Sequence, residues 1–243
     1  MGAMSLFVGT SGWSYAQWKP EFYPEKLPQR RFLEHYGTQL GAVEINATFY
    51  RSQSPETLTR WAADTPNEFS FAVKAHRALT YFKKFAPEGD KADFYTEFLK
   101  SLSPLGHKLG VVFMQFPQHR DRDDDQLRTL LDFLPDDHRY SFEFVNETWH
   151  TDEVRDAVSR LGTFVYVDRA GDPPDRLPPG PLAYVRLRVE SYDDAKRAAW
   201  AELLGREAAD RDVYAFIKHE EAHAGDPHAG VGLARWFQEN LGG

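Results

Sequence analysis

Residues 109–115 read LGVVFMQ, the most apolar of eight short runs in the chain, and the run ends in an amide. Short apolar runs rich in β-branched and aromatic residues and bounded by turn residues indicate buried strands. This run is therefore predicted to be the most deeply buried of eight strands. The other seven runs cover residues 6–9, 42–46, 69–74, 140–144, 163–168, 182–186 and 213–218.

Segments of helical length separate these runs. Residues 29–40 place Phe32, Tyr36 and Leu40 on one face, and Gly41 is a suitable stop. Pro55 at a first helical position and Ser54 as N-cap predict the start of the next helix. The remaining helical patterns cover residues 93–105, 123–134, 151–161, 193–204 and 230–241. Residues 170–181 hold five prolines, which predicts a loop or a very short helix at the sixth crossover.

Strands that alternate with helices predict parallel pairing and right-handed crossovers. A (β/α)8 barrel of the TIM type typically needs about 250 residues, and this chain has 243. We therefore predict an α/β fold with a single TIM-type barrel over residues 1–243, irregular around the sixth crossover. An open doubly wound sheet is the alternative. Residues 1–4, Met-Gly-Ala-Met, are interpreted as an expression remnant.

The composition narrows the range of partners. The net charge of −8 disfavours broad electrostatic binding of nucleic acid, although a local basic mouth is compatible with it. No run approaches the about 18 apolar residues of a membrane helix, so no membrane partner is expected. The chain has no cysteine, which excludes disulfides and thiolate metal sites, and no secretory signal is visible. A cytoplasmic location is therefore predicted.

Each predicted strand ends in a polar or charged group, and in a parallel barrel these ends meet at one mouth. Burial of an unpaired carboxylate is costly, so Glu44 and Glu143, inside their runs, must be paired or functional. Lys74, Arg186 and Lys218 are the expected partners. A structural lattice of salt bridges that closes the barrel is the alternative interpretation.

Several motifs resemble the YecE-like family, whose members carry domain of unknown function 72. They are GTSGWSY at residues 9–15 with Trp18 and FYP at 22–24, VEINATFYR at 43–51, FAVKA at 71–75, and QFP at 115–117, followed by Glu143, Trp149 and Asp168. The resemblance implies a TIM-barrel fold and no particular activity. The chain departs from the family pattern at Val145, at Arg188-Val189 and at the stretch from Lys218 to Glu221, where the family has Arg, His-Gly and an Asn-rich stretch.

The candidate catalytic residues are Glu44, Glu143 and Lys74. Two carboxylates in different environments can take opposite proton-transfer roles. Lys74 is interpreted first as a charge partner and second as a proton-transfer or Schiff-base group, if burial lowers its pKa. Aromatic side chains near the strand ends would stack on a ligand, with a lid core as the alternative. The candidate substrate-binding residues are Ser11, Trp13, Tyr15, Asn46, Tyr50, His76, Gln115, Trp149, Asp168 and Arg186.

Residues 219–223 read HEEAH, which matches the zinc motif H-E-x-x-H in form. The motif requires a helix, whereas here it follows a predicted strand and Gly225-Asp226-Pro227 interrupts the chain soon after. His219, His223 and His228 remain candidate ligands of a divalent metal. No organic cofactor is expected.

The sequence leaves three functional hypotheses. The first is an enzyme that uses acid and base carboxylates on a small polar, sugar- or nucleotide-like substrate bound at the mouth. The second is a non-catalytic or nucleic-acid-associated binding barrel. The third is a metal-dependent hydrolase of the phosphodiesterase type that uses His219 and neighbouring carboxylates.

Overall fold

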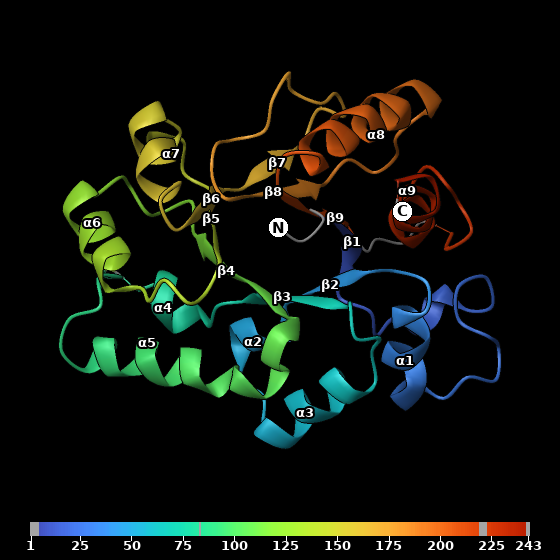
Figure 1. The fold of residues 1–243 in the computed structure, drawn as a ribbon, viewed down its shortest axis with the longest axis horizontal. Coiled ribbons are helices and arrows are strands. Elements are labelled where there is room, and N and C mark those ends of the chain that lie inside the picture. The colour runs from blue at the N-terminus through green and yellow to red at the C-terminus, as the bar shows by residue number, and fades with distance from the viewer. Residues whose placement is uncertain (1–4, 83, 219–222, 242–243) are drawn as a thin grey trace.

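The computed structural model describes residues 5–82, 84–218 and 223–241. Its strands are all parallel and form a ring with helices outside it (Figure 1), in the hydrogen-bonded order β6-β5-β4-β3-β2-β1-β9-β8-β7. The predicted TIM-type barrel is confirmed. The strands are β1 (Leu6–Ser11), β2 (Ala42–Ile45), β3 (Ser70–Lys74), β4 (Leu109–Phe116), β5 (Tyr140–Phe144), β6 (Gly162–Phe164), β7 (Tyr166–Asp168), β8 (Leu182–Leu187) and β9 (Asp212–Ile217).

The sixth predicted strand differs from the prediction, because residues 163–168 form two strands interrupted at Val165. β6 pairs with β5, and β7 pairs with β8. Val165 itself still donates its backbone N–H to Phe142 O at 2.9 Å. The first half of residues 162–168 thus hydrogen-bonds to β5 and the second half to β8, which brings the two ends of the sheet together.

Helices surround the ring. The long ones are α1 (Phe32–Gly37), α3 (Pro55–Ala63), α5 (Asp90–Ser101), α6 (Asp124–Phe133), α7 (Asp152–Val158), α8 (Asp194–Ala208) and α9 (Gly230–Leu241), and the short α2 (Ala47–Tyr50) and α4 (Arg77–Thr80) follow β2 and β3. Ser54 caps α3 as predicted, since its hydroxyl accepts from Thr57 N. Short 3-10 segments cover Ala16–Trp18, Gln29–Arg31, Ser103–Lys108, which is interrupted at Gly106, and Glu147–Trp149.

The first helical prediction needs adjustment, whereas the predicted loop at the sixth crossover is confirmed. Residues 29–40 form a 3-10 turn and then α1, which already ends at Gly37, where a Cβ would lie 2.8 Å from Pro66 Cδ. The sixth crossover, residues 170–181, contains neither helix nor strand, as its prolines predicted. No helix among the described residues is long and apolar enough to cross a membrane.

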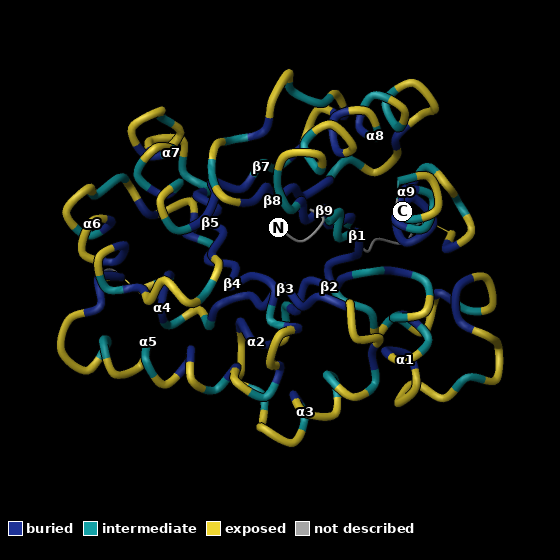
Figure 2. Tube along the Cα trace, in the orientation of Figure 1, coloured by how far each residue is buried: buried dark blue, intermediate teal, exposed yellow. Residues whose placement is uncertain are grey.

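Successive side chains along each strand point alternately outward, toward the helices, and inward, into the ring. On β2, Val43 and Ile45 face outward into the core shared with the helices, whereas Ala42 belongs to a cluster inside the ring. Figure 2 shows the strands buried and the outer helix faces exposed. The inward positions nearest the carboxyl ends of the strands are polar, and they form the candidate site.

Candidate functional site

Five inward-facing side chains form a continuous hydrogen-bonded row across the carboxyl end of the barrel, here called the polar row. Lys74 Nζ donates to Gln115 Oε1 at 2.8 Å, and Gln115 Nε2 donates to Glu143 Oε1 at 2.7 Å. Arg186 then joins two carboxylates, with Nη1 at 2.6 Å from Glu143 Oε2 and Nη2 at 2.9 Å from Glu44 Oε1. Every second side chain of a strand points into the ring, and Gln115 and Glu143 are register partners on neighbouring strands, so their side chains lie next to each other.

Glu44 is fully buried and saturated with donors. Besides Arg186, it accepts hydrogen bonds from Ser11 Oγ at 2.8 Å, Asn46 Nδ2 at 3.2 Å and Tyr184 OH at 2.8 Å. Burial alone would raise the pKa of Glu44, but the charges of Arg186, Arg188 and Lys74 outweigh burial and hold it well below its usual value. Glu44 is therefore a permanent anion that fixes Arg186 and is unsuited to donating a proton near neutral pH.

Lys74 forms no direct salt bridge with a carboxylate of the described residues, although its charge helps to hold the pKa of Glu44 low. The amide of Gln115 lies between it and Glu143, and its ammonium lies 4.4 Å from the centre of the Phe49 ring. Burial, reinforced by the charge of Arg186, lowers the pKa of Lys74 to about 8. This places its protonation equilibrium close to neutral pH.

Arg188 belongs to the site although the sequence marked it only as a departure from the family pattern. Its Nη2 donates to Ser11 Oγ at 2.7 Å, its Nη1 donates to Phe216 O at 3.0 Å, and Glu44 Oε1 lies 3.6 Å away. Burial, followed by repulsion from Arg186, lowers the pKa of Arg188 to about 10. Arg188 lies two positions after Arg186, so the period of two could have revealed it.

A cavity of about 540 Å³ opens beside the polar row, and we call it the mouth cavity. Glu143 is the single carboxylate among the described residues that line it. Polar side chains of strands β4, β5 and β8 and of the positions just after β7, β8 and β9 form much of its wall: Gln115, Glu143, Arg169, Arg186, Arg188 and Lys218. A cleft of this size suits a small polar molecule.

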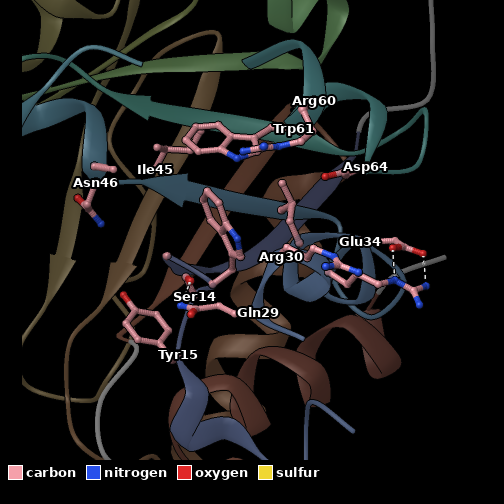
Figure 3. A pocket seen from close by; sticks show the side chains of 15 residues that line it. Ser14, Tyr15, Gln29, Arg30, Glu34, Ile45, Asn46, Arg60, Trp61 and Asp64 are labelled. Atoms are coloured by element: carbon pink, nitrogen blue, oxygen red, sulfur yellow. Dashed lines mark hydrogen bonds and ion pairs between the residues drawn. The ribbon is translucent and has the colours of Figure 1, made fainter. Parts of the chain in front are cut away.

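Three predicted binding residues line a second cavity of about 830 Å³, here called the side cavity. They are Trp13, Tyr15 and Asn46. In Figure 3, Trp61 and Ile45 lie across this cavity from Ser14 and Tyr15. Asn46 lines the side cavity and donates to Glu44, so it connects the side cavity with the polar row.

Four other predicted binding residues are not among those that line the mouth cavity. Trp149 has no exposed surface, because it stacks on Phe144 and its Nε1 donates to Arg120 O at 2.7 Å. Asp168 is buried and accepts from Tyr192 OH and from the backbone of the following loop. His76 caps α4 with its Nδ1, and Tyr50 is 71% exposed.

The candidate metal ligands are not brought together where they are described. His219 lies outside the described residues. His223 Nε2 lies 3.1 Å from Glu21, while His228 Nε2 lies 3.0 Å from Asp194. In the described ranges no group of three His, Cys, Asp or Glu side chains is arranged to hold a metal ion.

The ring of parallel strands with a charged site at their carboxyl ends defines a protein of the TIM-barrel class. A family model described as "Protein of unknown function DUF72" matches residues 7–242, and the chain belongs to this family. The UPF0759 protein YunF of Bacillus subtilis is 31% identical over 115 residues, which cover 46% of this chain and 40% of YunF. The UPF0759 protein YecE of Escherichia coli is 29% identical over 139 residues, 57% of this chain and 47% of YecE. The matched stretches thus span less than half of either relative.

Solved structures show the same fold. A DUF72 family protein from Thermotoga maritima superposes with a TM-score of 0.75 at 22% identity, covering 98% of this chain and 100% of that protein. One from Enterococcus faecalis gives 0.74 at 16% identity, covering 98% of each chain. A D-psicose 3-epimerase gives 0.54 at 10% identity over 98% and 96%, which is a likeness of fold alone.

Proposed function

We propose that this protein is an enzyme that binds a small polar, sugar- or nucleotide-like molecule in the mouth cavity and transfers a proton within it. The observation that carries the proposal is the connection of Glu143, which faces the cavity, through Gln115 to Lys74. A proton-transfer group works best with a pKa near the working pH, and the pKa of Lys74 is about 8.

The roles follow from the geometry. Glu143 lies on the cavity wall and is the proton-transfer group that contacts the substrate. Lys74 is the next titratable group along the polar row and exchanges its proton at near-neutral pH. Glu44 remains ionised and positions Arg186, whose guanidinium stabilises charge that develops on the substrate.

The test is proton exchange with solvent. The protein is incubated in D2O with a panel of sugars, sugar phosphates, nucleosides and nucleotides, and proton NMR follows deuterium incorporation and turnover. We expect at least one compound to exchange, and Glu143→Gln to slow exchange by about 100-fold or more. Glu97→Gln, which removes an exposed carboxylate on α5 paired with Lys100, is the matched control and should have no effect.

Two outcomes contradict the proposal. A compound that raises the melting temperature but shows neither exchange nor turnover would identify a non-catalytic binding barrel. Activity that is lost with EDTA and restored by a divalent cation would identify the metal-dependent hydrolase.

A further inference from the structure

The side cavity is larger than the mouth cavity, and the proposed proton transfer does not use it. Its volume is about 830 Å³, against about 540 Å³ for the mouth cavity, and no described residue lines both. Residues 9–15 and 43–51, which resemble family motifs, supply four and three of its fifteen lining residues and none of those that line the mouth cavity. These two motifs therefore shape the side cavity rather than the mouth.

Two tryptophan rings stand at right angles on the wall of the side cavity. Trp13 follows β1 and Trp61 lies on α3, with ring centres 5.0 Å apart and ring planes at 87°. Both rings pack against the core on one side but are only partly buried. A flat aromatic ligand that stacks on one indole therefore meets the other at right angles, and both contacts are favourable between aromatic rings.

Both indole N–H groups of this pair are accessible. Neither donates a hydrogen bond to a described residue, whereas Nε1 of Trp149 and Nε1 of Trp200 donate to backbone carbonyls in the interior. Neither is a buried group without a partner, in contrast to Nε1 of Trp18. Each of the two N–H groups can therefore donate to an acceptor on a ligand.

The charged side chains around the two rings are only partly engaged. Arg31 and Glu34 pair with each other through two hydrogen bonds. Arg30, Arg60 and Asp64 also line the cavity, and their side chains form no hydrogen bond or ion pair with the described residues. Guanidinium groups stack on aromatic rings and donate to ring acceptors, and a carboxylate accepts from N–H and amino groups.

We propose that the side cavity binds the base of a nucleoside, at a site separate from that of the proposed proton transfer. The base stacks on one indole and meets the other at right angles. Arg60 and Asp64, which adjoin Trp61 at the end of α3 (Figure 3), bond to its polar edge. A sugar ring can cover one indole face, but it offers no aromatic surface to the second indole or to a guanidinium plane. The net charge of −8 disfavours a nucleic-acid strand as the ligand.

The test is an NMR titration of the ¹⁵N-labelled protein with adenosine, guanosine, cytidine and uridine, and with ribose as the probe that lacks a base. We expect at least one nucleoside to shift the indole N–H signals of Trp13 and Trp61, which Trp13→Phe and Trp61→Phe assign. The signals of Trp149 and Trp200, whose N–H groups are bonded in the interior, should not move. Ribose should bind at least tenfold more weakly than that nucleoside.

Substitutions of Trp61 test the stacking surface. Trp61→Leu should weaken nucleoside binding about tenfold or more, whereas Trp61→Phe, which keeps a ring, should weaken it less. Trp236→Leu is the matched control and should leave binding unchanged, because Trp236 is also a partly buried ring on a helix, α9, and does not line the side cavity. Unchanged melting temperatures verify that the variants fold.

Four outcomes overturn the inference. The first is no binding of any of the four nucleosides at millimolar concentration, and the second is binding that leaves the signals of Trp13 and Trp61 in place. Ribose or benzoate that binds as tightly as the best nucleoside overturns the choice of a base, and a single-stranded 12-nucleotide DNA that binds more tightly overturns the small-molecule ligand.

The inference and the proposed function can fail independently. Nucleoside binding at Trp13 and Trp61 without proton exchange by any compound leaves the side-cavity site standing and removes the proposed function. Proton exchange without nucleoside binding does the reverse. Trp61→Leu should leave any proton exchange unchanged, and its loss in that variant would overturn the separation of the two sites.

Discussion

Replacing Lys74 by methionine should make the protein more stable at neutral pH. The folded state lowers the pKa of this ammonium from 10.5 to about 8, which means that folding disfavours the charged form by about 3 kcal/mol. Methionine keeps the length of the chain and removes the charge. Removing the charge therefore increases stability, and loss of the hydrogen bond to Gln115 offsets about 1 kcal/mol of this increase. We expect Lys74→Met to raise the free energy of unfolding by about 2 kcal/mol at pH 7.

The pH dependence gives this prediction a definite sign. The unfolded chain keeps the proton of Lys74 up to about pH 10.5, whereas the folded protein releases it near pH 8. Between these values the unfolded state binds more protons, so the wild type gains stability as the pH rises. The advantage of Lys74→Met should therefore shrink by about 3 kcal/mol between pH 7 and pH 10.5 and end slightly negative.

Urea denaturation of both proteins at several pH values between 6 and 10.5 measures this difference, because all other titrating groups cancel. Lys100→Met, on the exposed face of α5, is the control and should give a difference that does not vary with pH. A Lys74→Met protein that is less stable than the wild type at pH 7 would refute the reasoning. So would an advantage that stays constant as the pH rises.

Three further substitutions test the fold around the site, each by urea denaturation. Trp149→Ala should destabilise the protein by about 3–5 kcal/mol, because the ring is fully buried; a loss below 1 kcal/mol would show that it is not packed as described. Tyr184→Phe leaves Glu44 without one of its donors and should cost about 1–3 kcal/mol, and an unchanged midpoint would contradict that hydrogen bond. Gly9→Ala should prevent folding, since its Cβ would lie 1.9 Å from Ala42 O; a folded variant of near wild-type stability would disprove this close approach.

The barrel could be predicted because its strands repeat one pattern, an apolar run that ends in a polar group. The same period of two places Glu44, Glu143 and Arg186 on one inner face, and their pairing follows from the cost of buried charge. The depth of single side chains could not be predicted. Trp149 and Tyr50 both follow strand ends, yet one is in the core and the other is exposed, because the packing of distant helices and loops decides this.

The interruption at Val165 has a consequence for how the site is held together. The ring closes there through the covalent chain, since β6 bonds to β5 and β7 bonds to β8. Glu143 on β5 and Arg186 on β8 stand on opposite sides of this seam, and their 2.6 Å contact spans it. A ligand that binds Glu143 or Arg186 in place of the other therefore weakens a contact that holds the barrel closed. Amide hydrogen exchange in residues 162–165, which do not line the mouth cavity, should therefore report occupancy of the mouth.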